Sequence, residues 1–205
     1  MEKVILSSDN KDKIKEIKEI LKDLDVKLLS KKDLGLDNLE VVENGKTLES
    51  NALKKARSIY DVIKGHIVIA DDTGLFVDAL NGDPGIFSGR YSGENATYED
   101  NNEKLLKELN GLEDSKRSAY FMTVAAIIDK KGNEHIVKGI CKGKIAKEYK
   151  SEGGFGYDPL FIPEGYEESF REMGRENKNK ISHRKKALEE VRLKIEEILN
   201  ENRSN

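Results

Sequence analysis

Two adjacent carboxylates, Asp71 and Asp72, directly follow an apolar run at residues 67–70 and precede Thr73 and Gly74. The run is short and rich in β-branched residues, which is typical of a strand buried on both faces. Ligands of open α/β sheets bind beyond the carboxyl ends of such strands. Neighbouring carboxylates repel each other, and a cation relieves the repulsion. Because Mg²⁺ binds one or two carboxylates together with substrate phosphates, the stretch suggests the metal-holding, catalytic edge of a phosphate-processing site.

The same residues are also ordinary turn formers, since Asp and Gly both occur often in turns. Taken alone, residues 71–74 therefore leave a metal site and a plain turn equally open. A catalytic site would need further functional groups from other parts of the chain. The rest of the sequence must therefore distinguish a metal site from a plain turn.

The chain is predicted to begin with a strand at residues 3–8, a polar turn and a helix. In the helix, apolar residues from Ile14 to Leu24 recur at helical spacing. The N–H groups and dipole at the start of a helix suit a phosphate. Asp9 and Asn10 in the turn could equally be plain helix caps, so a phosphate site and a cap both stay open.

Later elements are marked by caps and by hydrophobic patterns. Thr47 is predicted to cap a helix that ends at Gly65, and Thr97 to cap another with a capping-box pattern to Asp100. Residues 118–129 and 134–149 are predicted to form an antiparallel hairpin of strands.

A glycine-rich stretch at residues 153–159 contains two aromatic residues, Phe155 and Tyr157. Glycine lets the backbone approach a ligand closely, and either aromatic ring could stack on a planar base or simply pack in the loop. Farther on, Ser182 is predicted to cap the terminal helix, which puts Arg184 in the first turn. An arginine there opposes the helix dipole, which suggests that it binds an anion or a carbonyl oxygen, unless it is only an exposed basic residue.

The composition excludes several classes of function. The 205 residues include 36 basic and 39 acidic side chains, for a net charge of −3, so we expect no attraction to nucleic acid or to an anionic membrane. Cys141 is the single cysteine, which excludes a disulfide within the chain and a cysteine-based zinc site. The polar N-terminus is no signal peptide, and the length allows one domain or two lobes. We therefore expect a cytoplasmic protein.

Six short motifs are distributed, in a fixed order, along nearly the whole chain. They are residues 8–13 (SDNKDK), residues 43–56 (ENGKTLESNALKKA), residues 70–75 (ADDTGL), residues 84–91 (PGIFSGRY), residues 154–159 (GFGYDP) and residues 182–184 (SHR). Each motif is weak alone, but their order and spacing resemble those of the inosine triphosphate pyrophosphatase family, the noncanonical purine nucleoside triphosphate pyrophosphatases.

The resemblance implies hydrolysis of dITP, ITP and XTP to the nucleoside monophosphate and pyrophosphate, with Mg²⁺ as cofactor. It also implies an α/β fold with an elongated mixed sheet and flanking helices. One pyrophosphatase domain, residues 1–205, would form two lobes around a central cleft, and the protein would be a homodimer. Its partner would be a small-molecule purine nucleotide, with no nucleic acid and no membrane.

The matched motifs also imply roles for single residues. Glu43 and Asp72 would hold Mg²⁺, with Asp71 close by, and Asp72 would activate the water that attacks the α-phosphorus. The implied substrate-binding residues are Ser8, Asp9, Asn10, Lys11, Asp12, Lys13, Lys55, Thr73, Phe155, Gly156, Tyr157, Asp158, Lys178, His183 and Arg184.

Within this set, hydrogen-bond polarity explains the choice of base. Hypoxanthine and xanthine present a carbonyl at position 6 and an N–H at position 1, and adenine reverses both. The His183 backbone and Arg184 would donate to the carbonyl, while Asp158 or nearby backbone would accept from the N–H. Adenine would leave these groups unpaired, which gives large discrimination. Guanine shares both features with hypoxanthine, so this polarity does not exclude GTP.

Two other functions remain open at this stage. A related pyrophosphatase for modified pyrimidine or methylated guanine nucleotides would share the chemistry and differ in the base pocket. A nucleotide-binding regulatory module would bind without turnover, but a phosphate sensor needs no carboxylates, so Asp71 and Asp72 argue against it.

Overall fold

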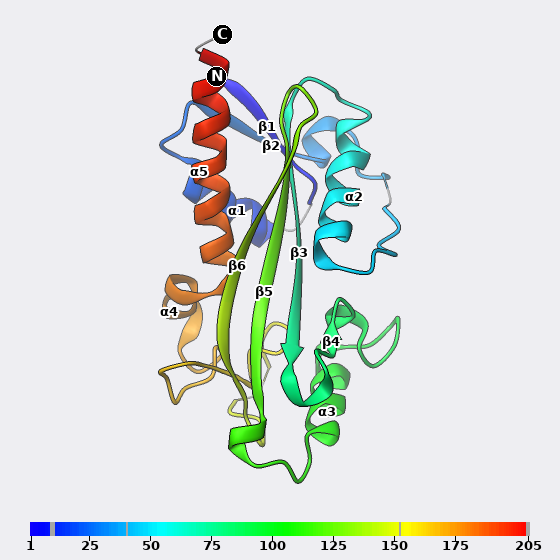
Figure 1. Ribbon diagram of the computed structural model, residues 1–205, viewed down its shortest axis with the longest axis vertical. Helices are drawn as coiled ribbons and strands as arrows, with labels where there is room; N and C mark the ends of the chain where they lie inside the picture. The colour runs from blue at the N-terminus through cyan, green and yellow to red at the C-terminus, as the bar shows by residue number, and fades with distance from the viewer. Residues whose placement is uncertain (9–10, 40, 152, 204–205) are drawn as a thin grey trace. The chain divides into compact units, whose positions relative to one another are not determined.

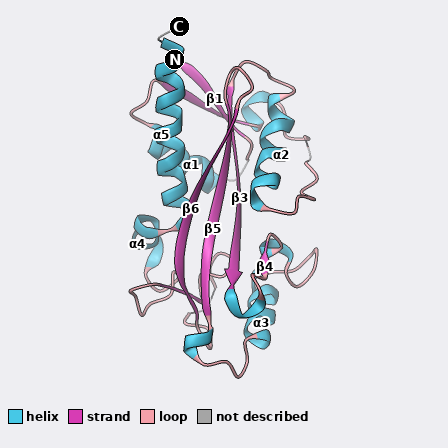
Figure 2. Cartoon of the chain, in the orientation of Figure 1, coloured by secondary structure: helices cyan, strands magenta, loops and turns pink. Residues whose placement is uncertain are grey.

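The computed structural model describes residues 1–8, 11–39, 41–151 and 153–203. Over these residues the chain is a mixed α/β fold with a seven-stranded sheet of strand order β2-β1-β3-β5-β6-β7, in which β4 also pairs with β3 (Figure 2). The strands are β1 (Glu2–Leu6), β2 (Val26–Ser30), β3 (Ile67–Val77), β4 (Pro84–Gly85), β5 (Ser118–Ile128), β6 (Glu134–Ile145) and β7 (Phe161–Pro163). The α-helices are α1 (Lys11–Leu21), α2 (Leu48–Tyr60), α3 (Tyr98–Glu108), α4 (Gly174–Ile181) and α5 (His183–Arg203). The predicted α/β class with a mixed sheet is confirmed.

The chain forms two compact units, each with its own hydrophobic core. The first unit comprises residues 1–72, 124–138 and 186–205, and the second comprises residues 73–123 and 139–185. The chain crosses from one unit to the other inside β3, β5, β6 and α5. The central cleft between two lobes stays a prediction.

In the first unit, β1 pairs in parallel with both β2 and β3, and Leu6 lies beside Ile69. Successive residues of a strand point to opposite faces. Ile67 and Ile69 therefore share one face, where they pack in a core with residues of α1 and α5. Figure 1 shows α1 and α5 on one side of β1 and β3, and α2 on the other. Strands covered on both faces in this way explain the continuous apolar runs in the sequence.

The second unit is built around the aromatic pair Phe121 and Phe161, whose ring centroids lie 4.7 Å apart. Strand β4 pairs antiparallel with the end of β3, and β7 pairs antiparallel with β6. Two glycines allow these close approaches. A Cβ atom on Gly74 would lie 2.5 Å from the Gly85 carbonyl oxygen, and one on Gly143 would lie 2.2 Å from the Ile162 carbonyl oxygen.

Strand β3 corrects the prediction that the strand ends at residue 70 and that residues 71–74 lie at its end or form a turn. The strand continues through both aspartates to Val77. In the sheet β3 is hydrogen-bonded to β5 as well as to β1. Past the aspartates, Leu75 also pairs with Gly85 of β4, and the Leu75 N–H donates to Ser88 Oγ at 2.8 Å. Tertiary pairing thus overrides the local turn preference of Asp and Gly. The acidic pair therefore lies inside a strand.

Other predicted boundaries are close but not identical. The first strand ends at Leu6 rather than residue 8, α2 ends at Tyr60 before reaching Gly65, and β6 ends at Ile145 rather than residue 149. The hairpin of β5 and β6 and both caps are confirmed. Thr47 and Thr97 each form a reciprocal capping box with the residue three positions later.

Helix α4 was not predicted, because Gly174 at its start and the polar residues along it give no helical periodicity. Ser182 ends α4, and its Oγ accepts a hydrogen bond at 3.2 Å from the Lys185 N–H, so the predicted cap of α5 is confirmed. Among the helices of the described residues, none has the length and hydropathy needed to cross a membrane.

Arg117 is a buried cation in the second unit, with 2% of its surface exposed. Its guanidinium donates to three main-chain carbonyl oxygens, those of Leu109 at 2.7 Å, Ile145 at 2.8 Å and Ala146 at 2.6 Å. Burial lowers the pKa of Arg117, but a guanidinium stays protonated in proteins. One side chain thus joins the end of α3 to the end of β6.

We predict that Arg117→Ala lowers the free energy of unfolding by about 3 kcal/mol, because three carbonyls lose a charged donor and a cavity forms. Arg57 is a matched control, since its guanidinium pairs with the partly exposed carboxylate of Glu134. Arg57→Ala should cost no more than about 1 kcal/mol. Chemical denaturation followed by circular dichroism measures both, and equal losses would contradict the role given to Arg117.

Candidate active site

The acidic pair is divided between the two faces of β3. Asp71 shares its face with Ile67 and Ile69, and Lys13 of α1 reaches it there with Nζ at 2.6 Å from Oδ2. Lys13 lies one helical turn before the buried Ile17, so α1 presents both residues to the strand. Asp72 points to the opposite face, toward α2. Strand alternation thus gives each carboxylate a different partner.

On the α2 face, the amine of Lys55 lies between two carboxylates. Its Nζ is 3.1 Å from Asp72 Oδ1 and 3.4 Å from Glu43 Oε2. Asn51, one turn earlier on the same helix face, donates from Nδ2 to Asp72 Oδ2 at 3.2 Å and accepts from the Gly45 N–H at 2.8 Å. Both oxygens of Asp72 are therefore held by α2. Asn51 also ties the segment that carries Glu43 to the helix.

Two further contacts set the position of this cluster. Ser7, directly after β1, donates from Oγ to the main-chain oxygen of Lys55 at 3.1 Å. The side chain of Ser50 completes the capping box with Thr47 at the start of α2. The helix is thereby fixed at its first turn and again at the turn that carries Lys55.

Burial and charge oppose each other in this cluster. Burial raises the pKa of the Asp72 carboxyl above its ordinary value, while the Lys55 charge works in the opposite direction. Burial lowers the pKa of Lys55, but the negative charges of Asp72, Glu43 and Asp71 outweigh it, so the pKa of Lys55 is raised. Lys55 is therefore a firmly held cation, and Asp72 is a more basic carboxylate than one in water.

The donor set fits a hard divalent cation such as Mg²⁺. The carboxylates of Glu43 and Asp72 both contact the Lys55 amine. The space between them therefore favours a positive charge. No group of three or more His, Cys, Asp and Glu side chains gathers into a metal centre within the described ranges. Mg²⁺ takes few protein ligands and completes its shell with water and phosphate. Coordination by Glu43 and Asp72 stays a prediction.

A second cluster of predicted residues lies in the second unit, around the loop of residues 153–159. Lys178 of α4 contacts Asp158 with Nζ 2.5 Å from Oδ2. Burial raises the pKa of Asp158, against the charges of Lys178, Arg184 and Arg171. The Lys178 amine also lies over the ring of Phe155, 6.0 Å from its centroid. Asp158 is thus a buried acceptor surrounded by basic groups.

The two aromatic residues of this loop take different positions. Tyr157 is buried, and its hydroxyl donates to the Ser88 carbonyl oxygen at 3.0 Å. Phe155 is 51% exposed. Of the two rings considered for base stacking, Phe155 is therefore the one that presents a free surface.

The remaining predicted residues are placed as follows. His183 is buried, with its ring stacked on Phe121 at 4.6 Å, so the side chain belongs to the core. Thr73 shares a hydrogen bond of 2.8 Å with Thr123, through their hydroxyl groups. Ser8 follows β1, and Lys11 and Asp12 begin α1. Asp9 and Asn10 lie outside the described residues.

Sequence analysis missed Asn51, Ser7 and Thr123 as residues that hold predicted site groups. The spacing of Asn51 and Lys55, four residues apart in a predicted helix, was a usable signal for the first. Ser7 and Thr123 gave none, since serine and threonine are common in strands and turns and their partners are distant in sequence.

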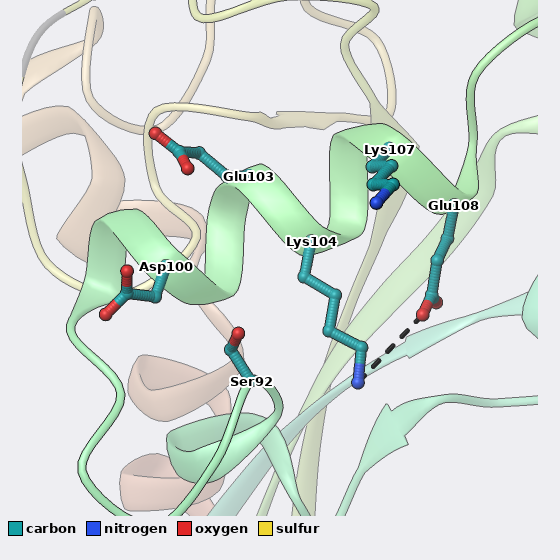
Figure 3. Close-up of a pocket in the computed structure, with 6 residues that line it drawn as sticks. All are labelled: Ser92, Asp100, Glu103, Lys104, Lys107 and Glu108. Atoms are coloured by element: carbon teal, nitrogen blue, oxygen red, sulfur yellow. Dashed lines mark ion pairs between the residues drawn. The ribbon is translucent and has the colours of Figure 1, made fainter.

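A separate surface hollow of about 600 Å³ lies along α3 and contains none of the predicted residues (Figure 3). It is lined by Ser92, Asp100, Glu103, Lys104, Lys107 and Glu108. The Lys104 amine lies 4.0 Å from Glu108 and donates to the Tyr91 carbonyl oxygen at 2.7 Å. Its lining charges are of both signs and include none of the predicted site residues, so this hollow is not the candidate site.

Comparison with known proteins gives matches over nearly the whole chain. The Ham1 family matches residues 4–194. A dITP/XTP pyrophosphatase of Caldanaerobacter subterraneus subsp. tengcongensis is 46% identical over 202 residues, which are 98% of this chain and 100% of the relative. A dITP/XTP pyrophosphatase of Clostridium perfringens is 47% identical over 204 residues, 97% and 100% of the two chains.

Solved structures of Ham1 proteins also superpose on nearly the whole chain. The Ham1 protein of Staphylococcus aureus superposes with a TM-score of 0.87 at 36% identity, over 95% of this chain and 98% of that one. A HAM1 protein of Coxiella burnetii superposes with a TM-score of 0.86 at 37% identity, over 96% and 100%.

We predict that Lys55→Met raises the pKa of Asp72 further, because the carboxylate loses its nearest opposite charge. The folded-state pKa would then lie farther above the ordinary value of 3.8. Since the folded state binds that proton more tightly, the stability of the variant should fall as the pH rises through this window. Carboxyl ¹³C NMR titration measures the pKa.

Lys54→Met is the matched control, because Lys54 precedes Lys55 on α2 but its amine, among the described residues, donates to the exposed Asn44 side chain and to no carboxylate. It should leave the titration of Asp72 unchanged. An unchanged or lower Asp72 pKa in Lys55→Met would contradict the electrostatic role of the amine.

Proposed function

Since this chain belongs to the Ham1 family, we propose that it hydrolyses the noncanonical purine nucleoside triphosphates dITP, ITP and XTP. The products are the nucleoside monophosphate and pyrophosphate, and the reaction cleanses the nucleotide pool. The relatives that carry the name dITP/XTP pyrophosphatase support this activity over nearly the full chain. The observation that carries the proposal is the Lys55 amine between Glu43 and Asp72. This arrangement places a cation that can bind phosphate beside two carboxylates that can bind a metal ion.

The resemblance implies a metal-dependent reaction, and Mg²⁺ is the ion that we propose. When bound by Glu43 and Asp72, Mg²⁺ offsets charge on the pyrophosphate leaving group and orients the triphosphate. Lys55 and Lys13 bind phosphate oxygens through their amines. Both lysines pair with carboxylates, so their side chains are already ordered before substrate arrives, which lowers the entropic cost of binding.

Asp72 accepts the proton of the water that attacks the α-phosphorus. The raised pKa of this carboxyl supports the assignment, because a general base works best when its pKa lies near the operating pH. Asn51 and Lys55 hold both oxygens of Asp72, so the carboxylate is oriented as well as basic. Asp71 is a supporting residue that holds Lys13 in place.

In the second unit, Phe155 stacks on the base and Asp158 accepts the N–H at position 1. Arg184 and the His183 backbone donate to the carbonyl at position 6. The burial of Asp158 supports this selection, because a buried acceptor left facing the N1 lone pair of adenine loses its hydrogen bond. The protein acts as a cytoplasmic homodimer and binds neither nucleic acid nor membranes in this proposal.

A pyrophosphate-release assay tests the function directly. We predict release from dITP, ITP and XTP with Mg²⁺, and at least about 100-fold lower kcat/KM for ATP, which leaves buried polar groups unpaired. Omitting Mg²⁺ should remove the activity. Comparable rates on ITP and dTTP would contradict the purine selectivity, and no release from any nucleotide would favour a binding module without turnover.

Asp72→Asn should lower kcat by at least about 100-fold, since it removes the proton acceptor and a metal ligand together. The fold should remain at least as stable at neutral pH, because the raised pKa of Asp72 shows that burying its charge is unfavourable. Pyrophosphate release and thermal unfolding measure the two effects. Asp78→Asn is the control, since the Asp78 carboxylate accepts a hydrogen bond from the Ser118 hydroxyl and no other among the described residues. Full activity in Asp72→Asn would place the base elsewhere.

A further inference from the structure

We propose that Tyr98 and Asn102 of α3 are positioning residues for base recognition, because they hold the loop of residues 153–159 in the conformation that presents Phe155. Neither residue belongs to the matched motifs. The inference deepens the proposed function and rests on it, since that function assigns the loop to the base.

Two residues of α3, four positions apart, contact two adjacent residues of the loop. Asn102 donates from Nδ2 to the Gly156 carbonyl oxygen at 2.9 Å. The Tyr98 ring meets the Phe155 ring edge to face, with centroids 5.1 Å apart and an angle of 61° between the planes. Residues four apart on a helix share one face. One face of α3 therefore holds two successive residues of the loop, one by its ring and the next by its backbone.

Helix α3 is a firm support for this loop. Thr97 and Asp100 close a capping box at its start, and Leu105 is fully buried in the core of the second unit. The neighbouring Asn101 holds another segment, accepting from the Ser92 N–H at 2.7 Å and donating to the Gly89 carbonyl oxygen at 3.3 Å. The helix thus holds two loops by adjacent asparagines.

The loop needs such support because its backbone is unusually free. Gly153, Gly154 and Gly156 all have positive φ angles, of 63°, 124° and 57°. A glycine-rich segment loses much conformational entropy when it is ordered. Contacts that hold it before the base arrives reduce that cost at the moment of binding.

Asn102 itself is a polar residue in an apolar position. It is 2% exposed, on the same helix as the buried Leu105, and its Oδ1 meets no donor among the described residues. A carbonyl only accepts hydrogen bonds, so Gly156 fixes the orientation of the amide with Nδ2 toward it. A buried acceptor without a partner lowers stability. Such a local cost is typical of positions kept for function rather than for folding.

The test compares two variants that both lose the Asn102 amide, and with it the Nδ2 donor to Gly156. Asn102→Leu keeps the volume of the side chain, and Asn102→Ala removes it without crowding, so one remains informative if the other folds poorly. Asn110→Leu is the matched control, because Asn110 is exposed just beyond α3. Tyr98→Leu removes the ring contact independently.

For each folded variant, calorimetry measures the binding of IMP and of inorganic pyrophosphate with Mg²⁺, and steady-state assays measure KM and kcat for ITP. We expect both Asn102 variants to bind IMP about 10-fold more weakly and to raise KM for ITP similarly. Pyrophosphate binding and kcat should stay within about twofold of the wild type, and Asn102→Leu should unfold at the same temperature or higher. Tyr98→Leu should weaken IMP binding in the same selective way.

Unchanged IMP binding in both Asn102 variants would overturn the proposal. Equal weakening of IMP and pyrophosphate would also overturn it, because a general loss of structure affects both ligands. If the wild type itself releases no pyrophosphate from ITP, the proposed function fails first. If the wild type is active and the Asn102 variants match it, only the positioning role fails.

Discussion

The ammonium group of Lys55, placed between Glu43 and Asp72, is the interaction on which the proposed phosphate chemistry depends. A buried carboxylate is costly unless a cation or hydrogen bonds compensate for the lost water. The compensation here comes from one helix, because Lys55 and Asn51 lie on the same face of α2. The contact also requires β3 to run through its two aspartates. If the strand ended at residue 70, alternation would no longer direct Asp72 toward α2 and Asp71 toward α1.

In both units, a buried carboxylate is compensated by a nearby positive charge. Each keeps a buried aspartate beside a lysine, Asp72 with Lys55 and Asp158 with Lys178. In each case burial raises the pKa of the carboxyl, which marks an unfavourable local charge. Perturbed pKa values of this kind gather at functional sites. Arg117 shows the contrasting, structural use of a buried charge, since its partners are main-chain carbonyls that no ligand replaces.

Elements whose signals are local could be predicted from the sequence. The capping box at Thr97, the helix cap at Thr47 and the β5–β6 hairpin follow from adjacent residues, and the structure has them. The end of β3 could not be predicted, because its continuation depends on pairing with β5 and β4, which are distant in the sequence and which local turn preference does not report. The division of Asp71 from Asp72 follows from strand alternation alone, but only once the strand is known to include them. Helix α4, which carries Lys178, could not be predicted either, because its residues are nearly all polar and mark no apolar face.

The central claim is that the acidic pair is functionally divided, with Asp72 and Glu43 on the metal side and Asp71 holding Lys13. The most direct measurement is calorimetric titration of Mg²⁺ into Glu43→Gln and Asp71→Asn, each saturated with a nonhydrolysable dITP analogue. The account predicts that Glu43→Gln loses at least about 10-fold in Mg²⁺ affinity, because a metal ligand is removed, while Asp71→Asn stays within about threefold of the wild type. A large loss in Asp71→Asn with unchanged affinity in Glu43→Gln would contradict it.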